Sequence, residues 1–133
     1  MLSSKPKILI VDDDKAILQA LSKIFQKKGY RVTTAEKGKE AIKEIAVHRY
    51  DVALVDLALP DMEGDKLFPL IQEASPKTVK IMLSGRIELE DNIEGADAFI
   101  PKPVAPDRLL NIIESKLTLK NRRKKHDRSH KRS

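Results

Sequence analysis

The chain has 133 residues, contains no cysteine, and draws only 4% of its residues from the aromatic types. Without cysteine it cannot form a disulfide, and no thiolate is available to bind a metal ion. No run of about eighteen apolar residues occurs, so the sequence predicts no membrane span. The apolar stretch at 8–11 is too short, and too soon followed by acids, to be a signal peptide. We therefore expect a soluble, cytoplasmic protein.

Basic charge is concentrated at the C-terminal end. The whole chain has a formal net charge of +6. Residues 120–133 hold eight Lys/Arg and one Asp, or +7, which leaves residues 1–119 at −1. The length favours one domain, so we expect a domain over 1–119 and a tail over 120–133. The tail is too polar to bury a core and is expected to be disordered.

Short apolar runs rich in β-branched residues alternate with segments of helical periodicity. The runs predict strands buried on both faces, except for a more polar second run. The expected strands are Lys7–Val11, Arg31–Ala35, Asp51–Asp56, Val79–Leu83 and Ala98–Ile100. The expected helices lie between Asp14 and Gly29, over Gly38–His48, over Gly64–Ala74, over a short, weak Ile87–Glu94, and from Pro106 to near Leu119. Pro69 should kink the third helix or delay its start.

This β-α alternation, repeated five times, predicts an α/β fold with a parallel sheet and helices on both faces. Ligands of such sheets bind beyond the carboxyl ends of the strands. The first strand is followed by Asp12, Asp13 and Asp14, the third ends in Asp56, and the fourth is followed by Ser84. Lys102 follows the fifth strand. These side chains should therefore meet at one edge of the sheet.

Carboxylates gathered at one edge repel one another unless a cation lies among them. A hard divalent ion with oxygen ligands, Mg²⁺ or alternatively Mn²⁺, would answer that repulsion. A metal, a carboxylate, a hydroxyl and an ammonium group are the parts that a phosphoryl-transfer site needs. Asp14, by contrast, is placed to cap the following helix. Asp61 and Glu63 are expected to lie in a solvated loop.

Four stretches in order carry a family resemblance: ILIVDDD, DVALVDLALPDMEG, IMLSG and AFIPKP. The spacing of Asp56, Pro60 and Gly64 resembles the phosphoacceptor loop of response-regulator receiver domains. The resemblance covers residues 7 to about 118 and is closest to the single-domain type, like the chemotaxis regulators. It implies a doubly wound, flavodoxin-like five-stranded sheet of order 2-1-3-4-5.

The resemblance also implies roles for individual residues. Asp56 would be the phosphoacceptor, and Asp12, Asp13, Asp56 and the backbone carbonyl of Ala58 would hold Mg²⁺. Lys102 would neutralise the phosphate, and its peptide bond to Pro103 would be cis. Ser84 would be the switch hydroxyl and Phe99 the aromatic switch position, although a plain core role for Phe99 stays open.

The implied activity is stoichiometric phosphoacceptance rather than enzymatic turnover. A histidine kinase or a histidine phosphotransfer protein would supply the phosphoryl group, and phosphorylation would alter binding of an output partner. The chain departs from the resemblance between Ser84 and Lys102, where the interval is shorter by about one helical turn, or roughly four residues. The fourth helix is therefore expected to be shortened.

Three alternatives stay open at this point. The chain could be a pseudo-receiver that binds partners without phosphorylation, or a Mg²⁺-dependent hydrolase with an aspartyl nucleophile. Ala58 argues against the hydrolase, because an acid would be expected two residues after the nucleophile. In the third alternative, residues 120–133 contact nucleic acid, an acidic partner or anionic lipid rather than being merely solvated. The tail has no aromatic residue to stack on bases, which argues against sequence-specific recognition.

Overall fold

Five parallel strands form one sheet in the order β2-β1-β3-β4-β5. We describe a computed structural model that covers residues 5–85, 94–103 and 105–132. The strands are β1 Lys7–Val11, β2 Arg31–Ala35, β3 Val52–Asp56, β4 Val79–Ser84 and β5 Ala98–Pro101. The predicted fold class and strand order are confirmed, and each strand lies within one residue of its predicted bounds.

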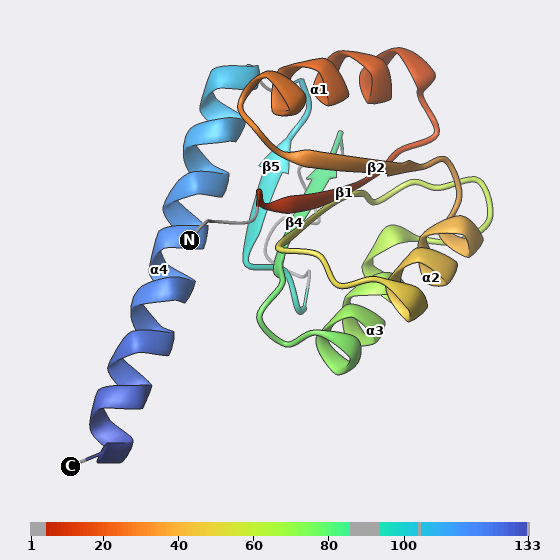
Figure 1. Ribbon diagram of the computed structural model, residues 1–133. Helices are drawn as coiled ribbons and strands as arrows, with labels where there is room; N and C mark the ends of the chain where they lie inside the picture. The colour runs from red at the N-terminus through yellow and green to blue at the C-terminus, as the bar shows by residue number, and fades with distance from the viewer. Residues whose placement is uncertain (1–4, 86–93, 104, 133) are drawn as a thin grey trace.

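In the described part of the chain, helices cover both faces of the sheet (Figure 1). The helices are α1 Lys15–Lys27, α2 Gly38–Val47, α3 Leu67–Ala74 and α4 Pro106–Arg132, and a short 3₁₀ helix, η1 Gly64–Lys66, precedes α3. One apolar cluster packs α1 and α4 against the sheet, and a second packs α2 and α3 against the opposite face. Every residue of β3 and β4 is buried, as expected for strands covered on both faces.

Local signals fix several helix ends as predicted. The Asp14 carboxylate caps α1 by accepting hydrogen bonds from the amides of Ala16 at 2.9 Å and Ile17 at 3.3 Å. Gly29 follows α1 with a positive φ of 92°, a conformation that glycine adopts without steric cost. Pro69 lies in the first turn of α3, which begins at Leu67 after η1. The α-helix thus starts late, as the proline requires.

The last helix differs from the prediction. It begins at Pro106 as expected but runs for 27 residues to Arg132, so the predicted helix end near Leu119 is wrong. The division of the chain into a domain over 1–119 and a tail over 120–133 stays a prediction. The apolar face of the helix ends near Leu119, but the following residues include many Lys and Arg, which favour helix, and no Gly or Pro to stop it. The C-terminal part of α4 projects beyond the sheet (Figure 1).

The predicted short helix Ile87–Glu94 falls almost wholly on residues 86–93, which lie outside the described residues; Glu94 itself lies in a turn. Among the helices that the structure describes, none combines the length and the apolar composition needed to cross a bilayer.

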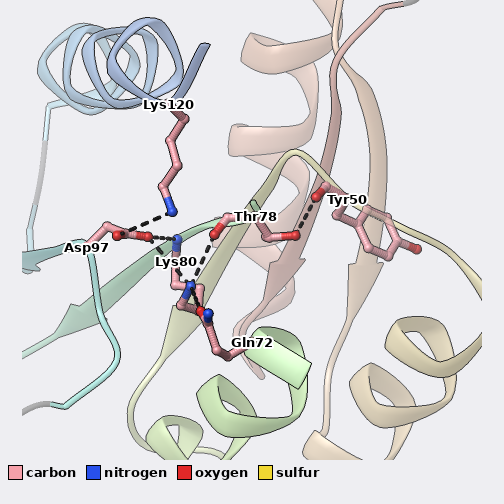
Figure 2. A network of polar contacts seen from close by, with 6 residues as sticks. All are labelled: Tyr50, Gln72, Thr78, Lys80, Asp97 and Lys120. Carbon is pink, nitrogen blue, oxygen red and sulfur yellow. Dashed lines mark hydrogen bonds and ion pairs between the residues drawn. The ribbon is translucent and has the colours of Figure 1, made fainter. Parts of the chain in front are cut away.

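A buried lysine joins several elements at the amino end of β4 (Figure 2). The side chain of Lys80 is only 4% exposed, and its ammonium donates to Gln72 Oε1 of α3 at 2.8 Å and to the Thr78 carbonyl at 3.2 Å. It also lies 3.8 Å from Asp97 Oδ2, while Lys120 of α4 lies 3.7 Å from Asp97 Oδ1. Because Asp97 precedes β5, this network ties α3, β4 and α4 together at the edge opposite the carboxyl ends of the strands.

Candidate functional site

The sheet register brings the predicted site residues to one edge. Val11 pairs with Val55, Asp56 with Leu83, and Ser84 with Pro101. The residues that end or follow these strands, Asp12, Asp56, Ser84 and Lys102, therefore lie side by side. Their proximity is a consequence of parallel pairing, which places all carboxyl ends at the same edge.

Three carboxylates converge at this edge. One oxygen from each of Asp12, Asp13 and Asp56 lies within 4.8 Å of the others. Asp12 and Asp56 are buried, whereas Asp13 is exposed. Asp12 is held firmly, since its amide donates to the Ala35 carbonyl at 3.0 Å and its Oδ1 accepts from the Asp14 amide at 2.9 Å. The cluster thus has two fixed inner acids and one acid open to solvent.

Lys102 bridges the two inner acids. Its ammonium lies 2.8 Å from Asp12 Oδ2 and 3.3 Å from Asp56 Oδ1. Burial tends to lower the pKa of Lys102, but the hydrogen bonds and negative charges of Asp12 and Asp56 outweigh burial and raise the pKa above its usual value. Lys102 therefore stays charged and faces Asp56 as a cation.

The surroundings of Asp56 oppose its ionisation. Its burial, and then the negative charge of Asp12, raise its pKa above the usual value. Lys102 and a hydrogen bond from the Ala58 amide act in the opposite direction without cancelling the effect. One ammonium therefore only partly neutralises three carboxylates.

The donor set fits a hard divalent cation. Mg²⁺ and Mn²⁺ bind to oxygen ligands, and the three carboxylates place such oxygens close together. The positive charge of the ion would also balance the negative charge that Lys102 leaves uncompensated. The acidic cluster could hold such an ion. The predicted ligands Asp12, Asp13 and Asp56 are thus brought together.

Comparison with known proteins agrees with this geometry. Residues 8–114 match the family model of the response regulator receiver domain. The chain belongs to that family. It is therefore a receiver domain of the kind found in two-component response regulators, a family whose members interact with histidine kinases and output partners.

Individual relatives support the same assignment. The receiver is similar to the cell cycle response regulator CtrA of Brucella ovis, with 32% identity over 113 residues, which cover 82% of this chain and 49% of the relative. The chain thus spans about half the length of the curated relatives it matches. It also resembles a CheY-like receiver domain protein from Methanospirillum hungatei JF-1, with TM-score 0.85, 40% identity, and coverage of 90% of this chain and 99% of that one. The chemotaxis response regulator CheY4 of Vibrio cholerae matches with TM-score 0.78 and 30% identity, covering 85% of this chain and 99% of that one.

Ser84 and Phe99 lie on the same face of the receiver sheet. Ser84 pairs with Pro101 and Met82 with Phe99, and residues two apart on a strand share a face. Ser84 is buried, and its carbonyl accepts a hydrogen bond from the Lys102 amide at 2.8 Å. Phe99 is half-buried against the apolar cluster that includes α3. The peptide bond between Lys102 and Pro103 is cis, as expected.

The loop after Asp56 contains a contact that the sequence analysis missed. Asp61 is exposed, but its carboxylate is not merely solvated: it accepts hydrogen bonds from the amides of Gly38 at 2.8 Å and Lys39 at 2.9 Å. The predicted exposed loop position of Asp61 is confirmed, but its hydrogen bonds to the start of α2 were not predicted. A lack of Ser, Thr, Asp or Asn at the N-cap of α2, where Lys37 stands, was the available signal that another group must cap this helix.

Proposed function

We propose that this receiver accepts a phosphoryl group on Asp56 from a phosphohistidine of a histidine kinase or histidine phosphotransfer protein. The observation that carries the proposal is the placement of Asp56. Its carboxylate lies beside a charged lysine and within a cluster of acids suited to a divalent cation. Most of the other residues predicted for the reaction lie at the same edge.

In the proposed reaction, an Asp56 carboxylate oxygen attacks the phosphorus of phosphohistidine. A new O–P bond forms, the P–N bond breaks, and its electron pair leaves with the imidazole, which takes up a proton. Lys102, held by Asp12 at 2.8 Å, is placed to bind a phosphoryl oxygen as negative charge gathers there. Hydrolysis of the acyl phosphate returns Asp56 to the carboxylate.

Mg²⁺, with Mn²⁺ as an alternative, would be held by Asp12, Asp13, Asp56 and the carbonyl of Ala58. When bound, it supplies positive charge that offsets the charge of the carboxylates and the phosphoryl oxygens. The raised pKa of Asp56 supports this requirement, because burial, and next the negative charge of Asp12, outweigh the opposing effects of Lys102 and the Ala58 amide.

Ser84 and Phe99 are the proposed switch. The Ser84 hydroxyl would bond a phosphoryl oxygen and draw its loop toward Asp56, and Phe99 would turn inward on the same face. Such a change needs only a few charge-assisted bonds to shift a two-state equilibrium. The protein then acts as a stoichiometric phosphoacceptor rather than as an enzyme with a separate substrate.

Intact mass spectrometry after incubation with acetyl phosphate and Mg²⁺ tests the proposal. Wild type should gain one phosphate adduct, and EDTA should abolish it. Asp56→Ala should show none, while the matched change Asp51→Ala, at the other end of β3, should leave labelling intact. No adduct on wild type, where a known receiver is labelled, would favour a phosphorylation-independent pseudo-receiver.

Residues 120–133 favour a second, independent activity, a non-specific contact with nucleic acid. The backbone is helical to Arg132, and the segment carries +7 with no apolar or aromatic side chain. A helix of this kind suits phosphate contacts rather than base recognition.

Affinity for duplex DNA should fall steeply with salt. Replacing four of its Lys/Arg residues by Gln should abolish binding, whereas Lys→Gln changes at Lys15, Lys23, Lys27 and Lys28 should not. Binding only to an acidic protein would refute the nucleic-acid contact.

A further inference from the structure

The start of α2 is capped by a residue from the loop that follows Asp56. Asp61 Oδ1 accepts from the Gly38 amide at 2.8 Å and Asp61 Oδ2 from the Lys39 amide at 2.9 Å. The N-cap residue Lys37 makes no side-chain hydrogen bond to the helix. Since the first amides of a helix lack partners within it, they need an outside acceptor. One carboxylate therefore serves two of these amides and ties α2 to the loop.

Side-chain packing strengthens the same contact. A Cβ atom added to Gly38 would collide with the thioether of Met62, the residue after Asp61. Glycine at position 38 thus allows the loop to lie directly against the helix start. The Asp61 hydrogen bonds and the Met62 contact act together, and we call this joint the loop clamp.

The clamped loop folds back on itself. The Leu59 amide donates to the Met62 carbonyl at 3.2 Å, and Ala58 forms an antiparallel bridge with Glu63. The Gly64 amide donates to the Leu57 carbonyl at 2.7 Å. Asp61 lies at the tip of this small hairpin and Ala58 near its base. Fixing the tip therefore also fixes the base.

Ala58 is the point where the hairpin meets the phosphoacceptor. Its amide donates a hydrogen bond to the Asp56 carboxylate. Its carbonyl is the proposed backbone ligand for Mg²⁺. The amide and the carbonyl of Ala58 belong to the two peptide units on either side of its Cα, so the backbone conformation of Ala58 affects both Asp56 and the proposed metal site.

We propose that Asp61 is a positioning residue that holds Ala58, through the loop clamp, in the orientation needed for Mg²⁺ binding beside Asp56. The inference rests on the proposed function of Asp56. Outer residues that orient the ligands of a metal commonly matter for affinity, because they remove conformations that cannot bind. Asp61 is not among the three clustered acids, so it would act on the metal site only through Ala58.

The test measures Mg²⁺ affinity by calorimetry, in the absence of a phosphodonor. Asp61→Ala should weaken Mg²⁺ binding by about tenfold. Asp61→Asn should lie between Asp61→Ala and wild type, because its amide keeps one acceptor oxygen. The phosphorylation rate at saturating Mg²⁺ should change by less than about twofold, since a positioning residue for the metal affects the Mg²⁺ requirement first. Hydrogen exchange at the amides of Gly38 and Lys39 should rise in both variants.

Matched variants distinguish the effect of the Asp61 charge from the effect of its hydrogen bonds to α2. Glu73→Gln removes one exposed negative charge on α3 and should leave Mg²⁺ affinity unchanged. Lys39→Pro removes one clamped amide in the first turn of α2, where proline is tolerated, and it also removes a positive charge. A long-range charge effect would then strengthen Mg²⁺ binding, whereas loss of the clamp should weaken it. Lys39→Gln has the same charge change with the amide intact and is the control.

The outcomes distinguish the two proposals. If wild type neither binds Mg²⁺ nor becomes phosphorylated, the proposed function fails. If wild type does both, and the Asp61 variants show faster exchange at Gly38 and Lys39 with unchanged Mg²⁺ affinity, the inference about Asp61 is overturned. If Lys39→Pro disrupts α2, seen as a loss of helical circular dichroism, the Asp61 variants alone decide.

Discussion

Replacing Asp56 by asparagine should make the metal-free protein more stable. The substitution keeps the shape of the side chain and an oxygen that accepts from the Ala58 amide, but it removes a buried negative charge. Lys102 keeps its shorter contact, 2.8 Å to Asp12 Oδ2. The change therefore relieves repulsion without leaving the Lys102 ammonium unpaired.

The magnitude follows from the geometry of the cluster. One carboxylate oxygen of each acid lies within 4.8 Å of the others, and two unit charges at that upper limit repel by about 3.5 kcal/mol at an effective dielectric constant of about 20. Asp12 and Asp13 together then oppose ionised Asp56 by about 7 kcal/mol, against an attraction of about 5 kcal/mol from Lys102 at 3.3 Å. Solvent screens the exposed Asp13, while the burial of Asp56 adds to the cost, so we expect a net gain of about 1–2 kcal/mol in the free energy of unfolding.

The gain should depend on pH in a defined direction. The pKa of Asp56 is raised in the folded protein by burial and by Asp12, so the folded state holds this proton more tightly than the unfolded chain. The cost of ionisation is absent below the usual value of 3.8 and develops as the pH rises through the folded pKa. The advantage of Asp56→Asn should thus be full at pH 7 and shrink on acidification.

Urea unfolding at pH 7 in EDTA measures the effect, and Glu73→Gln serves as an exposed control that should stay within about 0.5 kcal/mol of wild type. Mg²⁺ should reverse the order, because an ion at a hundred times its dissociation constant stabilises wild type by about 2.7 kcal/mol and the variant much less. If wild type is the more stable protein in EDTA, the assigned repulsion is wrong.

Two further substitutions test the frame around the site. Lys80→Ala should destabilise the protein by about 2–4 kcal/mol, because it opens a cavity and leaves Gln72 and Asp97 without their buried partner, whereas Lys80→Met should cost less than about 1 kcal/mol. Burial, and to a lesser extent Lys120, lower the pKa of Lys80 despite the opposing charge of Asp97. Wild type should therefore gain stability relative to Lys80→Met as the pH rises toward 10.5, which urea unfolding from pH 7 to 10 measures. If the difference in stability does not change with pH, the lowered pKa is contradicted. Gly64→Ala places a Cβ against the Asp56 carbonyl and should cost about 1–3 kcal/mol in thermal or urea unfolding, and an unchanged midpoint would show that the loop relaxes freely.

Much of the fold could be predicted because its signals are local. Apolar runs such as Lys7–Val11 and the helical spacing after Asp14 reflect which faces are buried, and side-chain periodicity records this directly. Parallel pairing then places the strand ends at one edge without further information. For that reason the sequence groups Asp12, Asp56 and Lys102 as one site.

Contacts between distant residues could not be predicted in this way. The 2.8 Å ion pair of Lys102 with Asp12, closer than its 3.3 Å approach to Asp56, depends on how β1, β3 and β5 are spaced. The Lys80 network depends equally on Gln72 of α3 reaching Lys80 and Lys120 of α4 reaching Asp97. No periodic pattern encodes such pairings, because each partner is an ordinary polar residue in its own segment.

The sequence by itself determined the order of strands and helices, the edge that carries the acids, and the basic character of residues 120–133. The tertiary structure decided that Asp61 caps α2, because a loop acid becomes a helix cap only when a helix start is brought within hydrogen-bond distance. How far α4 extends was likewise not predicted, since Lys and Arg permit both a helix and a solvated coil. Local periodicity determines which face is buried, whereas packing determines which groups meet.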